Sequence, residues 1–213
     1  MQTPENQPAP DSNDPPKPPE SPQQVRVNRT TARVPENIGR GVFSTGAIVM
    51  TGPNEFLIDF VQRMGRPHHV VARVVIPFGV LPQLIQALEA NVSKYESQFG
   101  PAKELPKPAA PPAQRPSIDE IYEGLKLPDE MLSGSYANAV LISHSAAEFS
   151  FDFVTSFFPH SAVSNRVYLS APHVKPLLDS LRTNFKQLQQ RMSKQQGQSE
   201  GEKEPPSSDE TGN

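Results

Sequence analysis

Cysteine and tryptophan are absent from the 213 residues of this chain. Without cysteine the chain cannot form a structural disulfide, a thiolate nucleophile or a cysteine-based zinc site. No stretch approaches the roughly 18 consecutive apolar residues that a membrane-spanning helix needs. The start of the chain also lacks the basic and apolar regions of a signal peptide. The sequence therefore predicts a soluble, cytoplasmic protein that does not bind a membrane.

Proline, by contrast, is abundant, and 16 of its 25 residues gather outside two regular blocks. They concentrate in Pro4–Pro22, Pro101–Pro116 and Pro205–Pro206. Such stretches bury too little apolar surface to offset the entropy of ordering them. The expected segments are a disordered proline-rich tail (1–33), a first folded block (34–100), a proline- and alanine-rich linker (101–126), a second folded block (127–195) and a disordered acidic tail (196–213).

The two folded blocks are copies of one another. Glu55–Val61 (EFLIDFV) matches Glu148–Val154 (EFSFDFV), which sets an offset of 148 − 55 = 93 residues. The same offset places Arg73 on Arg166 and continues without a gap in both directions. A register kept over such a length indicates a tandem duplication, and we call the two copies repeat one and repeat two.

Each repeat has the pattern of three strands followed by a helix. The expected strands are Phe43–Met50, Glu55–Gln62 and Val70–Ile76 in repeat one, and Tyr136–Ser143, Glu148–Thr155 and Val163–Leu169 in repeat two. Phe56, Ile58 and Phe60 alternate with more polar residues, as in a half-buried strand. The following segments, from Pro82 and from Pro172, carry apolar residues at spacings of three and four, which is typical of an amphipathic helix.

A meander of three strands with one helix covers only one face of its sheet. Two such modules can bury the remaining apolar surface by packing together. We therefore predict an α+β fold in which two tandem β-β-β-α modules pair as a pseudo-dimer within one chain. The 101–126 linker is long enough to join them without being folded itself.

Three segments carry a resemblance to a known family. They are Tyr136–Asn138 (YAN), Ser145–Phe153 (SAAEFSFDF) and Asn91–Gly100 (NVSKYESQFG). They resemble the Y-x-N strand, the S-x-x-E-F-x-x-D-F hairpin and the N-x-x-x-[YF]-E-x-x-F-G helix end of a bacterial and archaeal domain of unknown function, number 3467, present here in two copies. The resemblance implies the fold and no activity. Phe43–Thr45 and Leu188–Met192 depart from the pattern, so the repeats have diverged.

Two acid–base pairs are the most suggestive polar residues. Asp59 with Arg73, and Asp152 with Arg166, lie on neighbouring expected strands and are kept in both repeats. They could form a charged site on a sheet face. We favour structural ion pairs that fix the register of the strands, because such pairs commonly imitate functional sites.

The histidines give little support for an enzyme. None of the five (His68, His69, His144, His160 and His173) has a second histidine at metal-ligand spacing, so we expect no metal and no cofactor. His144 could be combined with Ser143 and Asp152 as a Ser-His-Asp triad. The chain has neither the G-x-S-x-G elbow nor a glycine-rich oxyanion loop, so we expect no catalytic residues.

The aromatic residues of repeat two suggest two functional hypotheses. Phe157 and Phe158 lie in a loop, and together with Tyr136, Asn138 and His144 they are the candidate interaction residues. The first hypothesis is a non-enzymatic protein-interaction or self-assembly module. The alternative is single-stranded nucleic-acid binding through an aromatic sheet face, although basic clusters are sparse.

Overall fold

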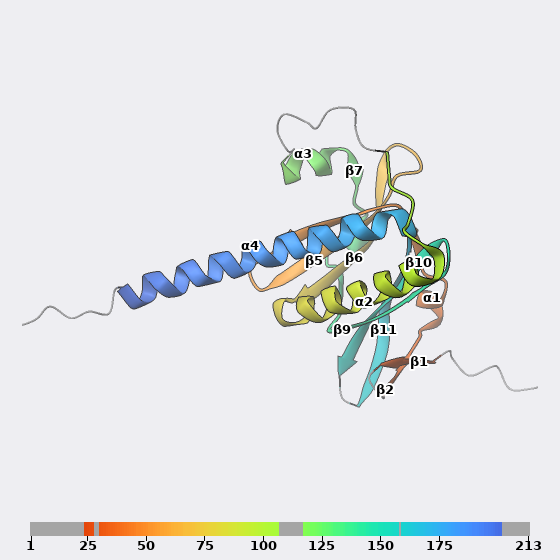
Figure 1. Ribbon diagram of the computed structural model, residues 1–213, viewed down its shortest axis with the longest axis horizontal. Helices are drawn as coiled ribbons and strands as arrows, with labels where there is room; N and C mark the ends of the chain where they lie inside the picture. Colours follow the sequence, from red (N-terminus) through yellow and green to blue (C-terminus); the bar gives the residue numbers. More distant parts are fainter. Residues whose placement is uncertain (1–23, 28–29, 107–116, 158, 202–213) are drawn as a thin grey trace, which may run out of the picture.

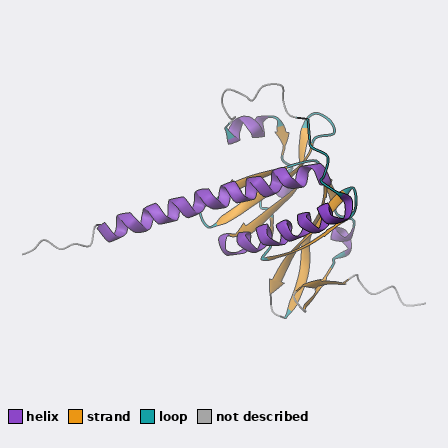
Figure 2. Cartoon of the chain, viewed as in Figure 1, coloured by secondary structure: helices purple, strands orange, loops and turns teal. Residues whose placement is uncertain are grey.

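The computed structural model describes residues 24–27, 30–106, 117–157 and 159–201 (Figure 1). One sheet contains β4 (Ala47–Thr51), β5 (Glu55–Gln62), β6 (His68–Pro77), β7 (Leu125–Lys126) and β8 (Ser135–Tyr136). The other contains β1 (Gln24–Val27), β2 (Thr30–Arg33), β3 (Val42–Ser44), β9 (Ala139–His144), β10 (Glu148–Phe157) and β11 (His160–Ser170). The α-helices are α1 (Glu36–Gly39), α2 (Leu81–Phe99), α3 (Ile118–Glu123) and α4 (Val174–Gly201), and single 3-10 turns span Phe78–Val80, Asp129–Met131 and Ala171–His173. The two long helices lie side by side against the sheets (Figure 2).

The centre of each sheet is the expected antiparallel meander. β4, β5 and β6 pair in sequence in repeat one, and β9, β10 and β11 do the same in repeat two. Alternate residues of β5 and β10 are fully buried: Phe56, Ile58, Phe60, Phe149, Phe151 and Phe153. Both middle strands carry an irregularity after the third of these buried residues, between Phe60 and Val61 and between Phe153 and Val154. The two repeats therefore share even the local departures from regular pairing.

The sequence-based prediction of the first strand of each repeat is wrong, because the structure divides that strand into two shorter strands in different sheets. β3 leaves repeat one and pairs in parallel with β11 of repeat two, while β8 leaves repeat two and pairs in parallel with β6 of repeat one. At the first break the buried Ser44 hydroxyl donates to the carbonyl of Gly46 at 2.6 Å. Both halves of the apolar run are packed on sheets, so hydrophobicity alone does not reveal where the chain crosses over.

The exchange extends upstream into the ranges that we assigned to tail and linker. β2 adds to β11 and β7 adds to β6, again in parallel and at equivalent positions. Strands β1 and β2 thus lie within 1–33, and α3 and β7 lie within 101–126. Short strands of mixed polarity have no strong sequence signal, and their pairing partner lies more than 50 residues away in the chain.

The helices also cross between the repeats, which confirms the pseudo-dimer. α2 packs on β9, and α4 packs on β4. The Tyr95 hydroxyl donates to the carbonyl of Ala146 at 3.1 Å, and Thr51 Oγ1 donates to Asn184 Oδ1 at 3.3 Å. One apolar cluster contains buried residues of both repeats. Neither repeat has a complete core of its own.

The two long helices end differently. α2 stops at Gly100, whose φ of 77° lies in the left-handed region that glycine adopts readily. α4 continues to Gly201, beyond the expected boundary at 195, and extends past the sheets (Figure 1). Within the described ranges, no helix has the length and apolar character needed to cross a membrane.

Candidate functional site

The ion pair of repeat one lies on the face of its sheet away from the long helices. Arg73 Nε and Nη2 donate to the two carboxylate oxygens of Asp59 at 2.8 and 2.7 Å. The Asp59 side chain is fully buried and that of Arg73 is 10% exposed. Arg73 Nη1 also donates to the carbonyl of Leu132, at 3.3 Å. Because Leu132 belongs to the segment exchanged from repeat two, the ion pair fastens that segment to the sheet.

The ion pair of repeat two has the same construction. Arg166 Nε and Nη2 donate to Asp152 at 2.6 and 2.8 Å, and Nη1 donates to the carbonyl of Gly39 at 3.2 Å. Gly39 and Leu132 are equivalent residues, since 132 − 39 = 93. The hydrogen bond to the carboxylate is the main cause that raises the pKa of each arginine, so both guanidinium groups stay charged. The two arrangements act as structural clamps and leave no charged group free for chemistry.

A glycine in each exchanged segment makes the clamp possible. Gly41 and Gly134 both have a positive φ, of 64° and 68°. A Cβ on Gly134 would lie 2.9 Å from Cγ of Arg73, and one on Gly41 would lie 2.8 Å from Cγ of Arg166. The backbone therefore passes directly over the arginine stem, where only glycine fits without displacement.

Tyr122 is a member of the first clamp that sequence reasoning missed. It lies on α3, whose start is closed by a capping box in which Ser117 Oγ accepts from the Glu120 backbone at 3.2 Å. The Tyr122 hydroxyl donates to Asp59 Oδ2. Burial, and then this hydrogen bond, raise the pKa of Tyr122 above its ordinary value. The S-x-x-E sequence of the capping box was the available signal for a helix here.

Tyr136, Asn138 and Phe157 come together at the end of β10. The rings of Tyr136 and Phe157 are stacked, with centroids 5.7 Å apart and planes at 11°. Thr155 Oγ1 donates to the carbonyl of Tyr136 at 2.6 Å, and Asn138 exchanges two hydrogen bonds with the Ser156 backbone at 2.8 and 3.0 Å. Tyr136 is 40% exposed and Phe157 is 60% exposed. We call these two residues the aromatic pair; Phe158 lies outside the described residues.

Repeat one holds Phe43 and Met64 at the equivalent positions. Hydrogen bonds between side chains and backbone join the same positions here. Gln62 Nε2 donates to the carbonyl of Phe43 at 3.5 Å, and Thr45 Oγ1 accepts from the Arg63 backbone at 2.8 Å. Phe43 is 41% exposed and Met64 is 72% exposed. An apolar side chain is therefore left in solvent at both positions of both repeats.

His144 lies at the opposite end of β9 from the aromatic pair, so its assignment as an interaction residue stays a prediction. Its ring packs among Tyr95, Phe99 and Phe149, with centroid distances of 5.8, 6.3 and 5.3 Å. It faces Phe149 across the strand pair, on the core side, whereas Asp152 points to the opposite face. A Ser-His-Asp triad built on His144 and Asp152 is therefore excluded by the alternation of the strands.

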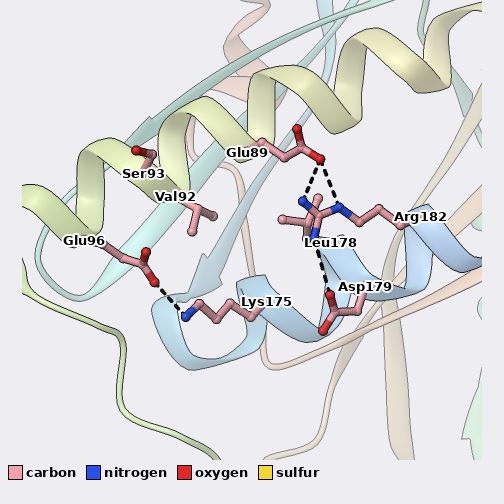
Figure 3. Close-up of a pocket in the computed structure, with 8 residues that line it drawn as sticks. All are labelled: Glu89, Val92, Ser93, Glu96, Lys175, Leu178, Asp179 and Arg182. Carbon is pink, nitrogen blue, oxygen red and sulfur yellow. Dashed lines mark hydrogen bonds and ion pairs between the residues drawn. The ribbon is translucent and has the colours of Figure 1, made fainter.

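A groove of about 250 Å³ runs between α2 and α4 (Figure 3). Its rim carries five charges. Two pairs join the helices, since Arg182 donates to Glu89 at 2.7 Å and Lys175 lies 2.7 Å from Glu96. Asp179 lies 3.8 Å from Arg182 on the same helix. Glu89 and Arg182 occupy equivalent positions, since 182 − 89 = 93, so this pair meets at the pseudo-twofold axis. The groove is therefore lined by three carboxylates and two cations, all of them paired, with an excess of one negative charge.

The model of the family of proteins of unknown function DUF3467 matches the chain twice, over residues 4–104 and 107–194. The chain belongs to this family. No curated protein and no solved structure matches it.

The DUF3467 matches both begin upstream of the strands, within the proline-rich stretches. At the repeat offset, four prolines of the first stretch fall on four of the second: Pro8, Pro15, Pro18 and Pro19 on Pro101, Pro108, Pro111 and Pro112. The proline-rich stretch therefore belongs to the repeating unit of this chain.

Most polar residues of the DUF3467-like segments in repeat two have a structural role. Ser145 Oγ donates to Glu148 Oε1 at 2.6 Å and closes the β9–β10 turn. Asp152 holds Arg166, and Asn138 holds the end of β10. The ring of Tyr136 is the exception, because it is exposed and contacts Phe157 alone among the aromatic side chains described.

Proposed function

We propose that this chain is a non-enzymatic protein-interaction module that binds a partner through the aromatic pair. The observation that carries the proposal is the exposed stack of Tyr136 on Phe157. Hydrogen bonds from Thr155 and Asn138 hold its backbone in place. Rigid aromatic side chains of this kind lose little entropy on binding and often dominate the energy of an interface.

The repetition of exposed apolar positions supports this proposal. Eight large apolar side chains are exposed in the described part of the chain, and six of them form three equivalent pairs. These pairs are Phe43 with Tyr136, Met64 with Phe157, and Phe99 with Met192. Single exposed apolar residues are common on any protein surface. Their retention at equivalent positions, after most other residues diverged, favours a contact surface.

The positions and contacts of the ionisable groups support a role other than catalysis. Asp59 and Asp152 are each held by a bidentate arginine, and His144 lies against the core. General acid–base catalysis requires a group that can exchange a proton with a bound substrate. Neither aspartate has that access, because each is buried and held by its arginine.

The burial of the β10 aromatic residues weighs against nucleic-acid binding through the sheet face. Phe149, Phe151 and Phe153 are at most 1% exposed, so they cannot stack on bases. Arg73 and Arg166 are engaged by carboxylates. Saturable and strongly salt-dependent binding of a single-stranded oligonucleotide by the intact chain would favour that alternative instead.

Removal of the aromatic pair tests the proposal. Proteins captured by the tagged full-length chain from its host extract would be quantified for the wild type and for Tyr136→Ser with Phe157→Ser. A specific partner should be depleted at least about tenfold, since aromatic hot spots commonly contribute more than 1.4 kcal/mol. The matched control is Phe43→Ser with Met64→Ser, which makes the same change at the equivalent positions. Unchanged capture by the Tyr136/Phe157 variant, with an unchanged melting temperature, would contradict the proposal.

A further inference from the structure

The chain itself contains a ligand suited to the aromatic pair. We infer that the pair is the docking site of the chain's own proline-rich N-terminal segment, residues 4–22. This inference rests on the proposed function, because it names the chemistry of the ligand that the pair binds: a proline-rich peptide in extended form.

The chemistry of the pair fits proline. Tyr136 and Phe157 present adjacent, nearly parallel rings that are 40% and 60% exposed. Aromatic surfaces of this kind bind proline-rich segments, since the proline rings pack on the aromatic rings and the polyproline helix is formed before binding. Residues 4–22 contain eight prolines, including Pro15-Pro16 and Pro18-Pro19.

The strand pairing brings the end of this segment close to the pair. Gln24 in β1 is opposite Arg33 in β2, Arg33 is beside Ala162 in β11, and Ala162 is opposite Thr155 in β10. Three strand spacings place Gln24 about 14 Å from Thr155. Thr155 is the residue whose hydroxyl holds Tyr136.

The length of the segment is sufficient for this contact. Nineteen residues in polyproline form extend about 60 Å, several times the separation to be bridged. A tethered ligand of this kind has an effective concentration of the order of millimolar, so even a weak contact is substantially occupied. The DUF3467 match includes residues 4–23, which agrees with a segment that works together with the folded module.

Paramagnetic broadening in the full-length protein tests the contact. The chain has no cysteine, so Ser12→Cys provides a single attachment site for a nitroxide. We expect selective broadening of the backbone amide signals of residues 155–157 and none at the equivalent residues 62–64. Substitution of Pro15, Pro16, Pro18 and Pro19 by serine, or of the aromatic pair by serine, should abolish the selective broadening. Phe43→Ser with Met64→Ser should leave it unchanged.

A mixed sample separates docking within one chain from docking between chains. Spin-labelled chains without ¹⁵N are combined with unlabelled ¹⁵N chains, so that only contacts between molecules broaden the signals. Broadening at 155–157 in this sample alone would overturn docking within one chain and assign the site to a second copy. Broadening that is absent, or spread equally over both hairpins, would overturn the inference altogether. If partner capture still depended on the pair, the proposed function would stand while this inference fell.

Discussion

Repeat one and repeat two keep the same clamp but cover it differently. In both, an arginine joins a buried aspartate to the carbonyl of an exchanged segment. In repeat one a helix from the 101–126 range adds a third group, the hydroxyl of Tyr122. Positions that hold the exchanged segments in place have been retained, whereas the surroundings of the clamp have diverged.

The hairpin tips show a second difference. The β5–β6 tip carries the basic residues Arg63 and Arg66 around Met64, whereas the β10–β11 tip carries Phe157, stacked on Tyr136. Equivalent hydrogen bonds between side chains and backbone stabilise both hairpin tips. A duplicated scaffold has thus kept its framework and changed the side chains that it presents, which is the pattern expected when only one copy retains a particular contact.

The clamps give the largest expected effect. Asp59→Ala should lower the free energy of unfolding by about 3–5 kcal/mol, because it leaves the Arg73 guanidinium buried without its carboxylate. Asp152→Ala should cost less, since its side chain is 9% exposed, whereas that of Asp59 is fully buried and also accepts from the Tyr122 hydroxyl. Chemical denaturation of the two variants measures the difference directly.

The double variant Asp59→Ala with Arg73→Met provides the control. Removal of both charges should recover part of the loss, because no unpaired charge then remains in the interior. Additive losses would show that Asp59 and Arg73 do not interact. Equal losses for the two aspartates would show that Tyr122 and the deeper burial add nothing to the first clamp.

The sequence predicted the parts of the fold that repeat with a strong apolar period. The meanders, the two long helices and the shared core follow from the alternation in Glu55–Val61 and from the helical stripes. The exchange of β3 and β8 could not be predicted. An apolar run is equally compatible with pairing in its own sheet or in the neighbouring one, and only the three-dimensional packing distinguishes the two.

The candidate site was predictable in part for a similar reason. The aspartate–arginine pairs stood out because both partners recur at one offset, and the structure places them on adjacent strands. The surroundings of His144 could not be predicted, because its neighbours Tyr95 and Phe99 come from a helix of the other repeat, about 50 residues upstream. Tyr122 was missed because a six-residue helix in a proline-rich range has almost no periodic signal.

Removal of the Tyr122 hydroxyl tests how much this group adds to the stability of the first clamp. Tyr122→Phe should destabilise the chain by about 1 kcal/mol, since a buried carboxylate oxygen loses a donor. The matched control is Tyr136→Phe, whose hydroxyl lies on an exposed ring and should contribute almost nothing. Denaturation curves of the two variants measured side by side decide the point, and equal stabilities would contradict the role of Tyr122.

The pH dependence of this effect has a definite sign. The folded state raises the pKa of Tyr122, so the folded chain keeps the phenol proton at a pH where the unfolded chain releases it. The stability supplied by Tyr122 should be complete below the ordinary tyrosine pKa of about 10 and should decline above it. The wild type should therefore lose its advantage over Tyr122→Phe as the pH rises beyond that value. A constant difference across the range would count against a buried, neutral phenol.

The smallest effect concerns the pseudo-twofold axis itself. Glu89 meets Arg182 there (Figure 3), and pairing of two identical repeats would instead bring two glutamates or two arginines together. Glu89→Arg alone should destabilise the chain, and adding Arg182→Glu should restore most of the loss. The side chains are 41% and 51% exposed, so we expect a coupling of only about 0.2–1 kcal/mol, reduced by salt. A double-mutant cycle at low and high salt measures it; additive losses would mean that this charge pair does not favour the pairing of unlike repeats.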